Sequence, residues 1–133
     1  MRRLAFILLV LVSAPGCATT GSAPGRARPV DDTGVASYLA SRFDGHATAS
    51  GARYDERRLT AAHRTLAFGT RVRVTNTGNG RSVVVAVIDR GPFKRGRVID
   101  VSKRAAIELG FLREGTARVR LEVLAPSSAA SRD

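Results

Sequence analysis

The sequence has few of the residues that build a disulfide-bonded or metal-binding protein. Cys17 is the only cysteine in the chain of 133 residues, so no intramolecular disulfide can form. The chain has two histidines, His46 and His63, which lie far apart, and with one cysteine they do not make a zinc site. We therefore expect neither a metal ion nor another cofactor.

Acidic residues are also scarce, and the resulting excess of basic charge indicates an anionic partner. Lys and Arg number 22 against 11 Asp and Glu, which gives a formal charge of +11. Without Arg2 and Arg3 the remainder still carries +11 − 2 = +9. Such a balance favours nucleic acid, acidic lipid head groups or acidic cell-wall polymer, and composition alone does not choose among them.

The N-terminus lacks an apolar run long enough for a permanent membrane helix. The run from Leu4 to Val12 follows two arginines and precedes the small residues 13–16, which is the order of a secretory signal. Cys17 comes next, and its place resembles a bacterial lipobox, in which the cysteine becomes the lipidated N-terminus. The alternative is a plain signal that is cut near Ala18 and leaves no anchor. Either interpretation predicts an exported chain.

Composition divides the chain into four segments. We expect a signal peptide with a lipobox at 1–17, a flexible linker rich in small residues and proline at 18–33, a folded domain at 34–125 and a disordered tail at 126–133. After the signal roughly 115 residues remain, enough for one domain with one core.

Period-two alternation of apolar and polar residues dominates the domain and predicts a mainly β fold. A weak first strand is expected where Val35, Ser37 and Leu39 alternate with other residues. A hairpin is expected from strands 71–76 and 81–88, because the glycines between them suit a tight turn. Val83 to Ile88 are apolar at six consecutive positions, which indicates a strand that is buried on both faces.

The second half of the domain adds one helix between two strands. Val98 to Val101 form a short strand, and Ser102 suits the N-cap of a helix that runs through Leu109, with Gly110 just past its end. The last strand, Arg118 to Leu124, alternates again. The sum is a small closed β structure with one short helix.

Two side chains stand out as candidates for chemistry. Asp89 directly follows the apolar strand, so it lies at the edge of the barrel or sheet where a loop begins. An Asp before Arg-Gly-Pro can be a catalytic acid or only a turn former whose carboxylate binds backbone N–H groups. His63, judged by the residues alone, is most simply a hydrogen-bonded structural histidine, and His46 is expected in a surface loop.

Several motifs in series resemble the RlpA family, rare lipoprotein A. They are TASG at 48–51, YD at 54–55, LTAAHRTLAFGTRVRVTN at 59–76, NGRSVVV at 79–85, DRGPF at 89–93 and GRVIDVS at 96–102. The resemblance covers nearly all of 34–124 in order. It implies a six-stranded double-psi β-barrel with one short helix, the activity of a septal ring lytic transglycosylase, and lipidation of Cys17.

The implied reaction cleaves the β-1,4 bond between N-acetylmuramic acid (MurNAc) and N-acetylglucosamine (GlcNAc) in peptidoglycan without water. An acid protonates the leaving oxygen, and the 6-hydroxyl of the muramoyl sugar closes on C1 to give a 1,6-anhydro end. Asp89 matches the family's catalytic aspartate and His63 its essential histidine. Five further residues are expected to bind substrate or to lie near the site: Tyr54, Asp55, Arg90, Phe93 and Asp100.

The chain departs from the family pattern at Ala52, where a glutamate linked to activity is frequent. Two other functions stay open beside the transglycosylase. One is a non-catalytic, expansin-like module that binds the wall. The other is an inverting glycosidase with Asp44 or Asp55 as base, which needs carboxyl groups roughly 6.5–9.5 Å apart.

Location and partners follow from the export signal and the resemblance. We expect a periplasmic protein, anchored to the outer membrane through a lipid on Cys17, that acts on glycan strands as a monomer. Cell-division proteins are candidate partners. Nucleic acid is not expected, because the chain is exported and has no nucleic-acid-binding motif.

Overall fold

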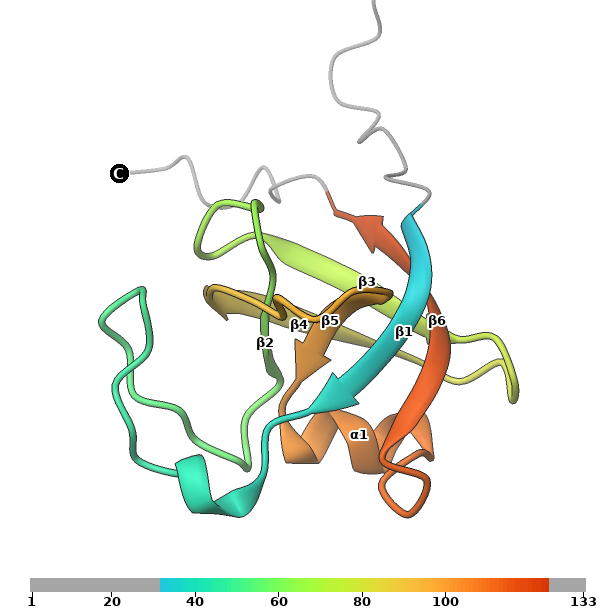
Figure 1. Cartoon of the computed structure of the whole chain (residues 1–133), viewed down its shortest axis with the longest axis horizontal. Helices are drawn as coiled ribbons and strands as arrows, with labels where there is room; N and C mark the ends of the chain where they lie inside the picture. The colour runs from blue at the N-terminus through green and yellow to red at the C-terminus, as the bar shows by residue number, and fades with distance from the viewer. Residues whose placement is uncertain (1–31, 125–133) are drawn as a thin grey trace, which may run out of the picture.

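The chain folds as a closed barrel of six strands with one α-helix (Figure 1), as predicted. The computed structural model describes residues 32–124, so the expectations for the signal peptide, Cys17 and the tail lie outside the described residues. The elements are β1 (Asp32–Tyr38), a 3-10 turn η1 (Ser41–Phe43), β2 (Thr60–Ala62), β3 (Arg71–Asn76), β4 (Ser82–Asp89), β5 (Arg97–Val101), α1 (Lys103–Leu109) and β6 (Thr116–Val123).

Around the barrel the strands follow the order β1-β5-β2-β4-β3-β6. The β1–β5 and β2–β4 pairs are parallel, and the other pairs are antiparallel. The β3–β4 pair is the predicted hairpin, in which Val74 lies opposite Val83. Because neighbouring parallel strands end at the same edge of a sheet, the ends of β2 and β4 bring His63 and Asp89 to one end of the barrel.

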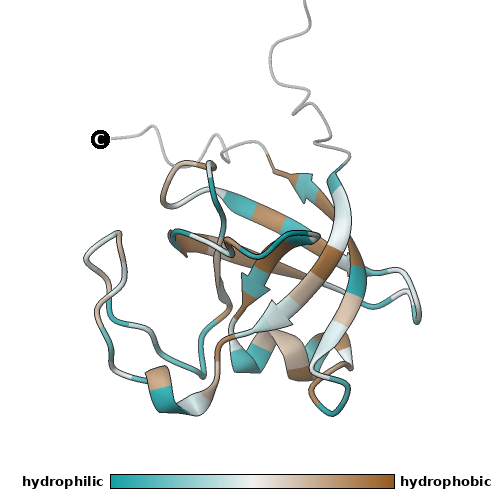
Figure 2. Cartoon of the chain, in the orientation of Figure 1, coloured by the Kyte–Doolittle hydropathy of each residue, from teal (hydrophilic) through white to brown (hydrophobic). Residues whose placement is uncertain are grey.

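The core fills the barrel with small and branched side chains, and the alternating colours along β3 and β6 reflect strands with one apolar and one polar face (Figure 2). On β4, Val83, Val85 and Val87 are buried, while Val84 and Ala86 between them are only half-buried. The prediction that this strand is buried on both faces was therefore wrong. One face packs into the barrel, as in other small barrels, and the other is partly open to solvent.

The predicted boundaries and the predicted first strand also need correction. β1 begins at Asp32, so the last two residues of the predicted linker belong to the barrel. Ala36 and Ser37 are buried in succession, which breaks the alternation predicted for Val35, Ser37 and Leu39. The register of β1 against β5 shifts between Val35 and Ala36, and such a bulge disrupts simple alternation.

Helix α1 covers one end of the barrel and carries the predicted caps. The Ser102 hydroxyl accepts a hydrogen bond from the Ala105 N–H at 3.3 Å, and Gly110 ends the helix with a φ of 74°. These are the N-cap and the left-handed C-cap that the sequence indicated. Ala105, Ala106 and Leu109 are buried against the barrel. Within 32–124, no helix has the length and apolar character to cross a membrane.

Candidate active site

Asp89 is the last residue of β4, and backbone groups from two segments hold its carboxylate. Its Oδ1 accepts hydrogen bonds from the Ala49 N–H and the Arg90 N–H, both at 2.9 Å. The Ser50 N–H donates to the neighbouring Ile88 carbonyl at 3.1 Å. The loop that contains the TASG motif is therefore docked on the end of β4.

A register shift in the β2–β4 pair explains why Ile88 is available to this loop. Ala61 pairs with Val87 and Ala62 with Asp89, so Ile88 is an extra residue on β4. A bulge of this kind leaves backbone groups unpaired and turns the following side chain to a new direction. The Ser50 N–H donates a hydrogen bond to the Ile88 carbonyl, and Asp89 follows directly after the bulge.

The Asp89 side chain opens into a pocket of about 210 Å³, which we call the Asp89 pocket. Its other lining residues come from the segment between β1 and β2: Leu39, Phe43, His46, Ala47, Thr48 and Tyr54. Of the described residues that line it, Asp89 is the one carboxylate. The volume lies below the range typical of drug-sized ligands, and it suits one sugar ring rather than several.

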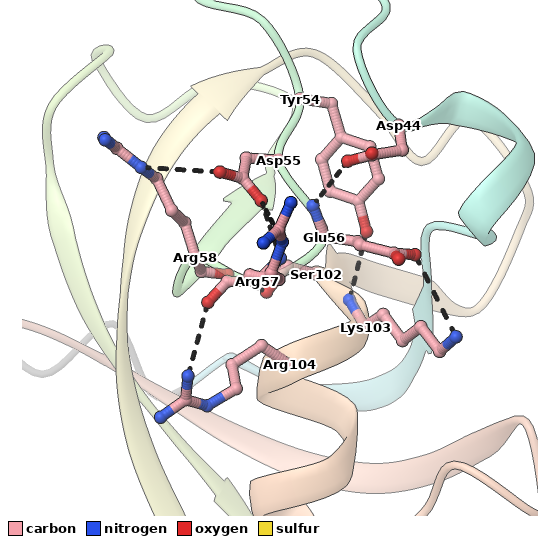
Figure 3. A network of polar contacts seen from close by, with 9 residues as sticks. All are labelled: Asp44, Tyr54, Asp55, Glu56, Arg57, Arg58, Ser102, Lys103 and Arg104. Atoms are coloured by element: carbon pink, nitrogen blue, oxygen red, sulfur yellow. Dashed lines mark hydrogen bonds and ion pairs between the residues drawn. The ribbon is translucent and has the colours of Figure 1, made fainter.

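Tyr54, predicted to bind substrate or to lie near the site, is buried and lines this pocket. Its hydroxyl donates to the Leu39 carbonyl at 3.0 Å and accepts from the Lys103 N–H at 3.1 Å, the second contact being drawn in Figure 3. Burial raises the pKa of the phenol above its ordinary value. Tyr54 thus ties the pocket segment to the N-terminus of α1, and little of its ring is exposed.

His63 follows β2 and lies beside Asp89 in the backbone, but its ring lines a different pocket. The His63 N–H donates to the Asp89 carbonyl at 3.1 Å. The ring belongs to a pocket of about 220 Å³ lined by Asp32, His63, Arg64, Thr65 and Val98, which we call the His63 pocket. No hydrogen bond joins the two side chains within the described part of the chain.

Burial lowers the pKa of the His63 ring below its ordinary value. Asp32 acts in the opposite direction, and the nearby Arg90 and Arg64 lower the pKa further. His63 as a whole is only 7% exposed, which explains why desolvation dominates.

Arg90, predicted to bind substrate, is engaged by the protein itself. Its guanidinium donates to the carbonyls of His63 at 3.1 Å and Leu66 at 2.7 Å, and it stacks over the Phe68 ring with a centroid distance of 4.0 Å. In the opposite direction, Arg64 on the loop after β2 donates a hydrogen bond to the Pro92 carbonyl at 2.6 Å. The two arginines thus fasten the loop after β2 to the segment that follows β4.

The remaining predicted site residues do not line the Asp89 pocket. Asp55 accepts from the Arg57 N–H and lies 3.8 Å from the Arg58 side chain (Figure 3). The Asp100 Oδ1 accepts hydrogen bonds from the Ser37 hydroxyl and the Arg97 guanidinium, both at 2.6 Å. Phe93 is 82% exposed on the loop after β4.

Asp44, considered as an alternative base, also has a local partner. Its Oδ1 accepts from the Glu56 N–H at 2.9 Å (Figure 3). Asp44 is absent from the lining of the Asp89 pocket, as is Asp55. Within 32–124, moreover, no group of three or more His, Cys, Asp and Glu side chains is arranged to hold a metal ion.

The structure adds two residues, Phe43 and His46, that the motifs did not single out. His46 is exposed, as expected for a surface loop, but it lines the Asp89 pocket with its ring edge-on to Phe43 at 6.0 Å. Neither residue stands in a recognised motif or in a periodic pattern. Their convergence on Asp89 depends on the path of the loop between β1 and β2.

Comparison with known proteins finds a matching family model and similar relatives. The family model described as "Lytic transglycolase" matches residues 33–121. The "Endolytic peptidoglycan transglycosylase RlpA" of Neisseria meningitidis is 54% identical over 98 residues, which are 74% of this chain and 41% of the relative. That of Vibrio cholerae is 50% identical over 93 residues, covering 70% of this chain and 35% of the relative. The chain thus spans about two fifths or less of the length of these relatives.

Among solved structures, the Streptomyces papain inhibitor aligns with a TM-score of 0.57 at 24% identity and covers 70% of this chain and 93% of the inhibitor. Cerato-platanin 3 from M. perniciosa aligns with a TM-score of 0.55 at 17% identity and covers 76% of this chain and 100% of that protein. At this level of identity the likeness concerns the barrel fold alone.

Proposed function

This chain belongs to the RlpA family of lytic transglycolases, whose domain is a double-psi β-barrel, and on that premise we propose that it is an endolytic peptidoglycan transglycosylase. In this proposal it cleaves MurNAc–GlcNAc β-1,4 bonds within glycan strands and leaves 1,6-anhydroMurNAc ends. Asp89 is the general acid.

The single carboxylate of the Asp89 pocket is the observation that carries the proposal. Hydrolases that add water to a glycosidic bond use two carboxyl groups, one as acid and one as base or nucleophile. A lytic transglycosylase needs only one, because its nucleophile is the 6-hydroxyl of the substrate. Asp44 and Asp55 do not supply a second carboxylate to this pocket, which favours the transglycosylase over the inverting glycosidase.

The proposed reaction uses the two oxygens of Asp89 differently. Oδ1 is held by the Ala49 and Arg90 amides, so Oδ2 carries the proton toward the substrate. That proton moves to the glycosidic oxygen as the C1–O bond breaks. The 6-hydroxyl oxygen then bonds to C1, and its proton returns to the Asp89 carboxylate. The enzyme ends in its starting state, and no water is consumed.

Three exposed aromatic rings, on η1 and on the loops that follow β2 and β4, support a carbohydrate substrate. Phe43, Phe68 and Phe93 are 37%, 42% and 82% exposed, and they make up three of the four exposed large hydrophobic side chains within 32–124. Phe43 ends η1 and lines the Asp89 pocket, Phe68 on the loop after β2 stacks with Arg90, and Phe93 follows the DRGP turn. Exposed apolar side chains can mark a binding surface, and a sugar ring has an apolar face that can pack on them.

The same proposal covers location and partners. The basic charge of +11 suits an acidic wall polymer, and the predicted signal suits export to the periplasm. We propose a lipid anchor at Cys17 in the outer membrane, a monomeric enzyme, and cell-division proteins as recruiting partners. These proposals depend on the sequence of residues outside 32–124 and on the family resemblance.

Mass spectrometry of purified glycan strands after incubation with the protein tests the proposed reaction. We expect products that end in 1,6-anhydroMurNAc, and we expect them to be missing with Asp89→Asn, because asparagine retains the Oδ1 acceptor but has no proton to give. Loss of general acid catalysis should lower the rate by about 10²–10⁴-fold. Glu122→Gln, on the outer face of β6 beside Arg73, is the matched control and should cleave normally.

Two other results would replace the proposal. Products with ordinary reducing ends would show a hydrolase, and Asp44 or Asp55 would then be the candidate base. Protein that sediments with the glycan but releases no product would show the non-catalytic, expansin-like module.

A further inference from the structure

The ring of His63 is held by two backbone amides in a way that fixes the position of its proton. The Thr65 and Leu66 N–H groups both donate to Nδ1, at 3.2 Å each. A ring nitrogen that accepts hydrogen bonds carries no hydrogen, so the neutral ring bears its proton on Nε2. The opposite ring orientation would set a C–H group against both amides and leave them without an acceptor.

The surroundings of the ring favour this neutral form. Burial lowers the pKa of the ring, and the charged groups that face it are Asp32 on β1, Arg64 on its own loop and Arg90 after β4. The two arginines are fastened to backbone carbonyls and keep their positive charges close by. A second proton would have to displace both amides from Nδ1 and would add a third cation to this cluster.

The Nε2–H group has no acceptor within residues 32–124, and the ring lines the His63 pocket of about 220 Å³. That pocket has no lining residue in common with the Asp89 pocket. The two pockets nevertheless adjoin one backbone junction, since the His63 N–H donates to the Asp89 carbonyl at 3.1 Å. A chain of sugars that crosses the ends of β2 and β4 can therefore reach both.

We infer that the His63 pocket is a second sugar subsite, in which neutral His63 donates its Nε2–H to a hydroxyl or acetamido oxygen and the Asp32 carboxylate accepts from a neighbouring hydroxyl. A fixed donor beside a fixed acceptor suits adjacent polar groups on a pyranose ring. His63 then binds and positions the glycan and transfers no proton. The inference rests on the proposed function, whose glycan it places in a second pocket.

Nitrogen-15 NMR of the full chain tests the state of the ring directly. Because the chain has two histidines, the spectrum of a His46→Asn variant assigns the His63 signals. We expect a protonated Nε2 and an unprotonated Nδ1 at neutral pH. A ring that carries its proton on Nδ1, or a doubly protonated ring at neutral pH, would overturn the inference.

The same spectra show whether glycan reaches the ring. An Asp89→Asn background prevents cleavage in the proposed reaction, and the tetrasaccharide of alternating GlcNAc and MurNAc serves as the probe. We expect the His63 Nε2 signal to move on binding. A tetrasaccharide that binds without moving this signal would show that the subsite lies elsewhere.

Two substitutions separate the donor at Nε2 from the acceptor at Nδ1. Glutamine can place an N–H donor near the Nε2 position, whereas asparagine can place only an acceptor near the Nδ1 position. We expect His63→Asn to bind the tetrasaccharide about five- to tenfold more weakly than wild type, as for one lost hydrogen bond, and His63→Gln to retain more of the affinity. Circular dichroism checks that both variants are folded.

Each outcome of this comparison decides a different point. If the His63→Asn variant binds the tetrasaccharide as well as wild type, His63 is only a structural hydrogen-bond acceptor and the subsite is overturned. Wild-type protein that binds the tetrasaccharide through both pockets but never cleaves glycan strands would overturn the transglycosylase and leave the subsite standing. Wild-type protein that does not bind the tetrasaccharide would overturn both.

Discussion

Arg90→Lys should destabilise the domain by an amount that its contacts allow us to work out. The substitution keeps the charge but removes the planar guanidinium, whose Nη1 donates to the Leu66 carbonyl at 2.7 Å and the His63 carbonyl at 3.1 Å. The side chain is half-buried, so each bond contributes about 1 kcal/mol after allowance for solvent. Stacking over Phe68 adds about 0.5–1 kcal/mol, and the total loss is roughly 2–3 kcal/mol.

Urea denaturation measures this loss, and a double-mutant cycle with Phe68→Leu isolates the stacking contribution. Arg71→Lys, at an exposed position of β3, is the matched control and should change the free energy of unfolding by less than about 0.5 kcal/mol. A loss for Arg90→Lys as small as that of the control would refute the structural role. If stability were kept while binding to glycan was lost, Arg90 would contact the substrate directly, as the family resemblance implies.

Three further changes test the fold and the site. Ser102→Ala removes the cap on the Ala105 N–H and the donor to the Arg58 carbonyl, so urea denaturation should show a loss of about 2 kcal/mol. Because burial lowers the pKa of His63, the unfolded chain binds more protons below about pH 6.5. The free energy of unfolding should therefore fall as the pH drops from there toward the lowered pKa, and His63→Asn should abolish this part of the fall. Ala52→Glu introduces the glutamate that the family resemblance implies, at an exposed position of the loop docked on β4. If the proposed reaction holds, it should raise the rate of anhydro-product formation by about tenfold, which equals roughly 1.4 kcal/mol. An unchanged rate would show that this site works without a carboxylate there.

The parts of the fold that depend on local patterns were predictable from the sequence. Alternation in Arg71–Asn76 and the glycines before β4 specified the hairpin, and Ser102 and Gly110 specified the two ends of α1. Each of these signals lies within a few residues of the structure it produces. They act through the chain's own geometry and need no distant partner.

The elements that depend on distant partners were not predictable in this way. β2 has only three residues, Thr60–Ala62, two of which are small alanines, and it is held by β4 and β5 on either side. The six consecutive apolar residues of β4 suggested burial on both faces, but Val84 and Ala86 on its second face are only half-buried. Tertiary context decides both cases.

The candidate site shows the same division between local and distant determinants. The sequence placed Asp89 correctly at the end of an apolar strand, because a strand end is a local feature. It gave no sign that Phe43 and His46 would line the Asp89 pocket, since their contact with it is made by a loop that is distant in sequence. The resemblance grouped His63 with Asp89 as one catalytic pair.

The bulge at the end of β4 explains why that pair is divided between two pockets. In a regular parallel ladder, Ala62 would pair with Ile88, but the extra residue puts Asp89 in register with Ala62 and turns its carboxylate to the Ala49 amide. His63, one residue beyond the ladder, turns its ring to the amides of its own loop instead. One backbone hydrogen bond thus joins Asp89, the proposed acid, to His63, the proposed hydrogen-bond donor to sugar. Under this proposal a glycan strand laid across the junction would meet Asp89 at one sugar and the neutral imidazole at another. The two residues would then act on the same polymer without exchanging a proton.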